Sequence, residues 1–92
     1  MDVYLAEVKG VMSLLNDDGS LDFENFYTRL IVEDVEGPWH YVKNELAPSV
    51  LKEEHKNFNK ILKIELKSWR RHSLGKLINI LAEEASMENN LN

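Results

Sequence analysis

The chain is 92 residues long with 43% hydrophobic residues, which suits one small domain with a single core. It has no cysteine, so disulfides, thiol nucleophiles and cysteine–zinc sites are excluded. Its formal net charge is −5, and no apolar run reaches the length of a membrane span. Because the N-terminus lacks the basic start and apolar stretch of a signal peptide, we expect a cytoplasmic protein.

Residues 2–15 have the apolar spacing of an amphipathic helix. Leu5, Val8, Met12 and Leu15 recur at steps of three and four residues, which places them on one helical face. Asp2 is a suitable N-cap for this segment. We therefore predict a first helix here.

The stretch NDDGS, residues 16–20, predicts a tight corner because Asp, Gly and Ser all favour turns. It partly matches the centre of an EF-hand calcium loop, with Gly19 at the sixth position. The first and twelfth positions then fall on Leu14, which has no side-chain oxygen, and Asn25, which has no carboxylate. The sequence therefore predicts a corner without a metal site.

Two further helices are predicted between residues 22 and 46. After Asp22, a suitable N-cap, apolar residues again share one helical face. They are Phe23, Phe26, Tyr27, Leu30 and Ile31. Gly37 can close this helix, and Pro38 can open a short one that continues to Leu46.

The longest predicted helix runs from Ser49 to about Arg71. Six positions, five of them apolar, follow at helical intervals; they are Leu51, His55, Phe58, Leu62, Leu66 and Trp69. The alternative is a strand over residues 62–67, LKIELK, whose apolar and polar residues alternate. We favour the helix because no other segment alternates convincingly and an isolated pair of strands is unstable.

The last predicted helix begins at Ser73 and places Leu74, Leu77, Ile78, Leu81 and Ala85 on one side. The predicted fold is therefore all-α: a compact bundle of four to five helices with one long amphipathic helix. Residues 1–86 would form a single domain and residues 87–92 a disordered tail. A helix of roughly 33 Å exceeds the core of so small a bundle, which also suggests a homodimer.

The charges are unevenly distributed. Residues 52–76 hold eight Lys or Arg against three Glu, whereas the rest of the chain is strongly acidic. The candidate residues for binding phosphate or an acidic partner are Lys56, Lys60, Lys63, Lys67, Arg70 and Arg71. On the predicted helix most of them form one basic stripe. The simpler interpretation is a solvated face, which contributes little to stability.

The acidic residues on or beside the second predicted helix indicate the opposite kind of partner, because an acidic surface can attract a basic protein. The candidate partner-binding residues are Tyr41, Asp18, Asp22, Glu33, Asp34 and Glu36. Tyr41 is included because an exposed aromatic residue is a common binding hot spot. Negative charge that only maintains solubility is the simpler interpretation.

No pattern in the sequence supports an enzyme or a cofactor. The three histidines are far apart, and no glycine-rich phosphate loop is present. We therefore expect a small acidic protein-binding module: an inhibitor, an immunity-type protein or a regulatory adaptor that acts through helix surfaces. The alternative is a nucleic-acid-binding module that uses the basic stripe.

Overall fold

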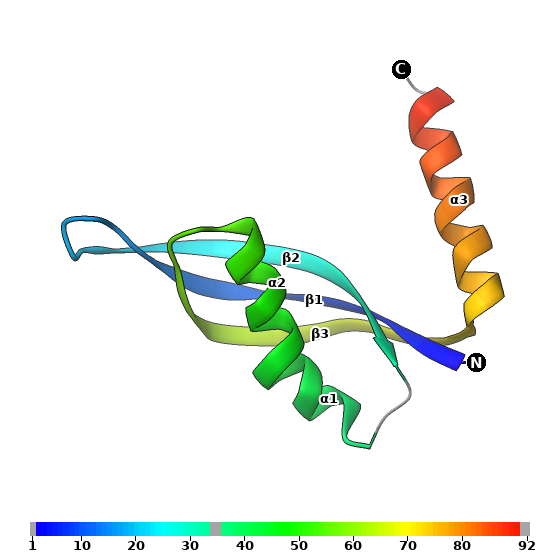
Figure 1. Ribbon diagram of the computed structural model, residues 1–92, viewed down its shortest axis with the longest axis horizontal. Helices are drawn as coiled ribbons and strands as arrows, with labels where there is room; N and C mark the ends of the chain where they lie inside the picture. The colour runs from blue at the N-terminus through cyan, green and yellow to red at the C-terminus, as the bar shows by residue number, and fades with distance from the viewer. Residues whose placement is uncertain (1, 34–35, 91–92) are drawn as a thin grey trace.

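The computed structural model describes residues 2–33 and 36–90, and it shows a three-stranded antiparallel sheet with helices beside it (Figure 1). The strands are β1 (Asp2–Leu15), β2 (Leu21–Glu33) and β3 (Phe58–Ser73), and their order in the sheet is β2-β1-β3. The helices are α1 (Pro38–Tyr41), η1 (Val42–Leu46), α2 (Ala47–Glu54) and α3 (Leu74–Asn90). The prediction of an all-α bundle is therefore wrong.

The first predicted helix is the central strand β1, which carries apolar residues on both faces. Ala6, Val8 and Met12 point to the face covered by the helical segment 38–54, and Val3 and Leu5 point to the opposite face, where α3 begins. We call these the helix-covered face and the outer face. A strand that is buried on both sides loses its alternation of apolar and polar residues, so a helical interpretation competes with it.

The second predicted helix is strand β2, and its helical appearance comes from two apolar rows. Phe26, Leu30 and Val32 are buried on the helix-covered face. Phe23, Tyr27 and Ile31 pair with β1 residues of the other parity and therefore lie on the outer face, where they are exposed. Read together along the sequence, the two rows place apolar residues three and four positions apart, which is the spacing of an amphipathic helix.

The longest predicted helix is also wrong, because α2 ends at Glu54 and residues 58–73 form the edge strand β3. Its pairing with β1 shifts register three times. Each shift inserts one extra residue in β3, namely Asn59, Leu62 and Lys67. These insertions place Phe58, Ile61 and Ile64 on the helix-covered face three residues apart, which resembles a helical period. The strand alternative for residues 62–67 was the correct one.

The segment from Pro38 to Glu54 is a continuous helical path with one wider turn, η1. The Ala47 amide donates to the carbonyl of Val42, five residues earlier. Pro48 follows directly. In a regular α-helix its ring would clash with the carbonyl group of residue 44, four residues earlier. The extra residue of a π-type turn relieves this conflict, so the helix continues where the sequence predicted a break.

The main core lies between this helical segment and the sheet. Val42, Ala47 and Leu51 from the helical segment pack against the helix-covered face, and Leu51 is only 1% exposed. A second, smaller cluster joins Leu77 of α3 to Val3 and Leu5 of β1. Figure 1 shows α3 projecting away from the sheet beyond this contact. Among the described residues, no helix is long and apolar enough to cross a membrane.

Candidate functional site

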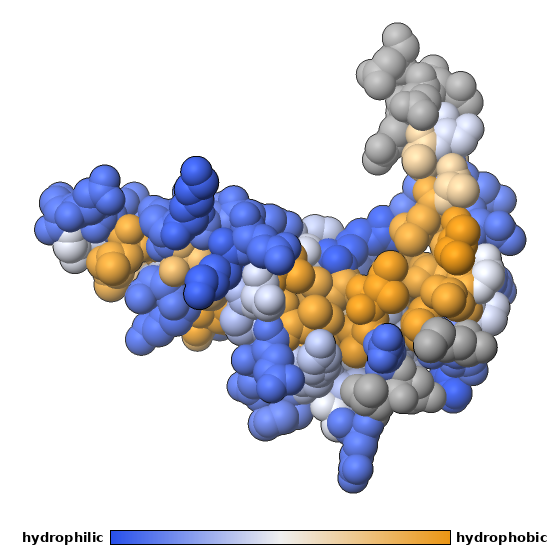
Figure 2. Space-filling model, in the orientation of Figure 1, coloured by the Kyte–Doolittle hydropathy of each residue, from blue (hydrophilic) through white to orange (hydrophobic). Residues whose placement is uncertain are grey.

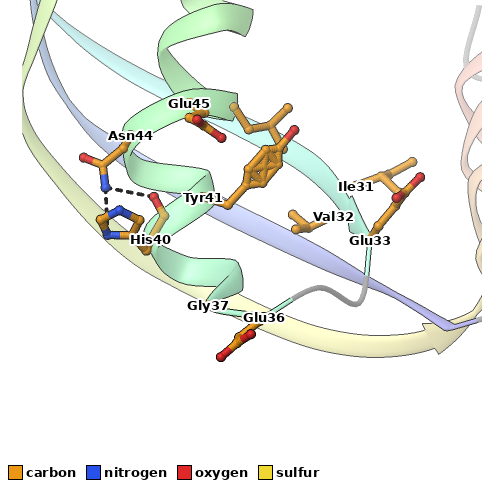
Figure 3. A pocket seen from close by; sticks show the side chains of 10 residues that line it. Ile31, Val32, Glu33, Glu36, Gly37, His40, Tyr41, Asn44 and Glu45 are labelled. Carbon is orange, nitrogen blue, oxygen red and sulfur yellow. Dashed lines mark hydrogen bonds between the residues drawn. The ribbon is translucent and has the colours of Figure 1, made fainter.

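A cleft of about 670 Å³ lies between the C-terminal end of β2 and the start of the helical segment (Figure 3). Its lining residues are Ile31, Val32, Glu33, Glu36, Gly37, His40, Tyr41, Asn44, Glu45 and Leu46. They come from two stretches of the chain, residues 31–37 and 40–46. The cleft thus forms where the chain leaves the sheet and turns into the helix.

Gly37 and Pro38 set the position of Tyr41 in this cleft. Gly37 adopts a left-handed conformation with φ of 64°, which residues with a side chain rarely adopt. Pro38 then opens α1 with its fixed φ. One turn later the half-buried ring of Tyr41 lies between the helix and Ile31 and Val32 of β2 (Figure 3).

Three carboxylates line the same cleft, and they are exposed. They are Glu33 at the end of β2, Glu36 before the turn and Glu45 on η1. The lining includes no Lys or Arg, and within residues 2–33 and 36–90 no ion pair is formed by these three carboxylates. The cleft therefore combines an aromatic and aliphatic wall with negative charge at its rim.

His40 and Asn44 form the opposite side of the lining. The Asn44 side-chain amide donates to the His40 carbonyl at 2.9 Å and lies 3.1 Å from His40 Nδ1. These contacts, drawn in Figure 3, hold the two side chains together one turn apart on the helix. Neither Asn44 nor Glu45 was singled out from the sequence, because only the path of the helix after Gly37 places them beside Tyr41.

The structure brings together only part of the predicted partner-binding set. Tyr41, Glu33 and Glu36 share the cleft, whereas Asp34 lies outside the described residues. Asp18 and Asp22 belong to the β1–β2 hairpin, and Asp22 pairs with Leu14 of β1. They are therefore at the far end of the hairpin from the cleft.

Asp18 has a local structural role in the hairpin turn. Its Oδ1 accepts hydrogen bonds from the Ser20 amide at 2.9 Å and from the Ser20 hydroxyl at 2.6 Å. These bonds favour the carboxylate and lower the pKa of Asp18 below its ordinary value. Within the described part of the chain, no group of three His, Asp or Glu side chains is arranged to hold a metal ion.

The predicted basic stripe does not exist as a helical face. Lys60, Lys63 and Arg70 pair with β1 residues of the outer face, Arg71 pairs with Tyr4, and Lys67 is a bulge residue. Lys56 lies in the turn that precedes β3. The six basic residues are therefore distributed along an edge strand and the turn before it. Charged side chains on an edge strand also discourage its pairing with a strand of another chain.

Several of these cations already have carboxylate partners. Lys63 Nζ lies 2.9 Å from Glu65, and Lys9 Nζ lies 3.8 Å from the same residue. Arg71 lies 3.1 Å from Asp2. The pKa of Glu65 is lowered, chiefly by its hydrogen bond to Lys63. A hollow of about 430 Å³ beside Lys9 and Lys63 is thus electrically mixed rather than basic.

Sequence reasoning missed the exposed apolar row on the outer face of β2, which we call the outer row. It consists of Leu21, Phe23, Tyr27 and Ile31, each between 43% and 62% exposed. All four are apolar or aromatic, so a prediction from the sequence assigns them to the core. The signal that could have identified them is the second apolar row, which exceeds what one face of a half-buried strand requires.

No family model, no curated protein and no solved structure matches this chain. A function is therefore supported only by the geometry of its own residues.

Proposed function

We propose that the protein is a small protein-binding module whose acidic cleft receives a basic segment of another protein. The observation that carries the proposal is that Glu33, Glu36 and Glu45 line the same cleft as Tyr41. The volume of about 670 Å³ falls within the range of ligand-binding clefts and accommodates one or two side chains. An inhibitor or a regulatory adaptor would use such a surface.

Arginine is the side chain that fits this chemistry best. Its guanidinium group can stack on the face of the Tyr41 ring while it forms hydrogen bonds with a carboxylate. Rim charges such as those of Glu36 and Glu45 mainly increase the rate of encounter with a basic partner and make it sensitive to salt. The proposal therefore predicts binding that weakens as salt increases.

The test uses a fluorescent arginine-rich peptide as the probe and anisotropy as the measurement. The variant with Glu33→Gln, Glu36→Gln and Glu45→Gln should bind the probe about tenfold more weakly, and Tyr41→Ala should do the same. The matched control replaces Glu24, Glu53 and Glu54, three exposed acids outside the cleft, with Gln. Equal loss in the control, or no difference between wild type and cleft variant, contradicts the proposal.

Nucleic-acid binding is the weaker alternative for two physical reasons. The six candidate basic residues do not share one face, and Lys63 and Arg71 are paired with carboxylates. The net charge of −5 also opposes binding to a polyanion. The remaining argument for it is that Lys60 and Arg70 lie on the same face as Phe23 and Tyr27.

A further inference from the structure

Helix α3 covers only one end of the outer face. Leu77 contacts Val3 and Leu5, with Leu81 packed beside them, and Arg29 of β2 forms an ion pair with Glu84 at 2.7 Å. A helix is about 10–12 Å wide, whereas a strand of 13 residues such as β2 extends for roughly 43 Å. Within residues 2–33 and 36–90, therefore, no layer covers most of the outer face, including the hairpin half with Phe23.

The uncovered part of β2 exposes several large apolar side chains. Phe23 is 62% exposed and Tyr27 is 58% exposed, and both belong to the outer row. A sheet buries its apolar face against another layer in stable domains. Asn25 and Arg29 lie on the same face and separate Phe23, Tyr27 and Ile31 from one another. Large apolar side chains exposed together on one face nevertheless mark an interaction site.

Helix α3 carries a complementary surface that its own sheet does not use. At 100° per residue, Leu74, Ile78, Ala82 and Ala85 fall on one arc beside that of Leu77 and Leu81. All four residues of this arc are exposed, and Ile78 is 55% exposed. Figure 2 shows hydrophobic residues continuing from the body of the molecule onto the lower part of α3. The arc is a narrow apolar ridge on a projecting element.

The dimensions of the chain show how much surface is left uncovered. Its radius of gyration is 15.4 Å, whereas about 12 Å is usual for a compact domain of this length. It exposes 6544 Å², and a folded monomer of 10.7 kDa usually exposes about 5,500 Å². The excess of about 1,000 Å² slightly exceeds the area of roughly 800 Å² that one partner contributes to a standard interface.

We propose that the chain is a homodimer in which the exposed arc of α3 in each copy covers the outer row of the other copy. In this two-fold arrangement each α3 lies in the angle between two sheets. Its Leu77 side rests on Val3 and Leu5 of its own sheet, and the adjacent exposed arc rests on Phe23 of the partner's sheet. The apolar surfaces are buried at the centre, and the basic residues Lys60 and Arg70 remain at the rim in water. This distribution is typical of stable interfaces.

A second copy fits this surface better than another kind of partner because both halves of the interface are on one chain. The outer row lacks a covering layer within the described residues, and the exposed apolar arc of α3 can provide one. An isologous contact also repeats each interaction twice, so one modest apolar ridge per chain is sufficient. The acidic cleft beside Tyr41 lies at the end of β2 away from Phe23 and shares only Ile31 with the outer row, so most of its lining stays open in this dimer.

The first test is sedimentation of the full chain over a concentration series. Wild type should dimerise, and Phe23→Ser and Ile78→Ser should each raise the dimer dissociation constant about tenfold or more. The matched control is Leu66→Ser, because Leu66 is 44% exposed and pairs with Val8 on the helix-covered face. Circular dichroism checks that each variant retains its fold.

The second test uses the absence of cysteine from the chain. Phe23→Cys and Ile78→Cys proteins are mixed and treated with a short thiol cross-linker. A product of twice the chain mass should form in the mixture faster than in either variant alone. Leu66→Cys mixed with Ile78→Cys should give little of it.

Several outcomes overturn the homodimer. They are a wild-type monomer throughout the concentration series, equal weakening by Leu66→Ser, and cross-linking that does not depend on residue 23. A monomer that retains a single-stranded oligonucleotide, and loses it on Phe23→Ser, would assign the outer face to nucleic acid instead. These measurements do not involve the cleft, so they can fail while the proposed function holds, and the reverse is also true.

Discussion

Gly10 occupies a position in the central strand where a side chain does not fit. A Cβ atom there would lie 1.8 Å from the carbonyl oxygen of Lys63 in β3 and 2.9 Å from the Phe26 ring. The first neighbour is backbone, which can move only if the β1–β3 pairing is disturbed. Glycine inside a strand often marks such a close approach.

Gly10→Ala should therefore destabilise the fold by about 3 kcal/mol, at the upper end of the usual cost of overpacking. Gly75→Ala is the control, since Gly75 lies in α3 with open space around it. That substitution should be neutral or stabilise by up to about 1 kcal/mol, because alanine favours a helix. Urea unfolding measures both, and equal effects at the two positions would contradict the role assigned to Gly10.

Tyr27 should keep its proton to a higher pH than an ordinary tyrosine side chain. Its hydroxyl donates to Glu7 Oε2 at 2.6 Å, and this hydrogen bond raises the pKa of Tyr27 above the ordinary value of 10.0. Glu7→Gln should lower the pKa of Tyr27, and ultraviolet titration at alkaline pH should show the late step moving to lower pH. Lys9→Gln, on the same face, should leave it in place.

At the scale of the element, the ion pair between Arg29 and Glu84 is a contact that holds α3 beside β2. The hydrogen bond from Arg29 lowers the pKa of Glu84 below its ordinary value of 4.5. A lowered pKa means that the contact is fully present above pH 4.5 and is lost as the pH falls through the lower, folded-state value. We therefore expect α3 to loosen in acid while the main core stays intact.

Methyl resonances of Leu77 and Leu51 measure this difference. The Leu77 signal should shift as the pH falls below 4.5, and the Leu51 signal should shift less. Arg29→Gln should give the loosened Leu77 signal at neutral pH, without a further acid step. Lys9→Gln is the control, because Lys9 pairs with Glu65 instead. An unchanged acid step in Arg29→Gln would exclude this ion pair as its cause.

The elements also show which parts of the fold can be predicted from the sequence. The corner at Asp17–Ser20, the helix start at Pro38 and the last helix are encoded by local turn, cap and spacing signals, and the structure has them. The strands are not encoded locally. Apolar residues on both faces hide the alternation of β1 and β2, and three bulges change the spacing in β3 from two to three.

The sequence indicated some of the residues of the candidate site but not how they are arranged. Tyr41, Glu33 and Glu36 were selected as candidate binding residues from charge and expected exposure, and the structure places them at one cleft. That they bind a partner stays a prediction. Glu45 was not grouped with them, because its place beside the end of β2 depends on the left-handed turn at Gly37. The outer row was misassigned to a core because a sequence does not show which apolar face lacks a covering layer.

At the scale of the whole molecule, one extended chain presents two different surfaces. The acidic cleft lies between the end of β2 and the helical segment, and the outer row runs along the outer face of the same strand and meets the cleft at Ile31. A dimer through the outer row would carry two clefts. Such a protein could bind two basic segments at once, which raises the apparent affinity for a repeated or dimeric partner without new contacts.

The dimer has a thermodynamic consequence that does not depend on any ligand. If two chains complete each other's fold, unfolding also separates them, so stability increases with protein concentration. Each tenfold increase should raise the midpoint of thermal unfolding by about 4 °C for an assembly of this size. Phe23→Ser should abolish this dependence and Leu66→Ser should preserve it. A midpoint that is independent of concentration in wild type would show that the outer row is not buried by a second copy.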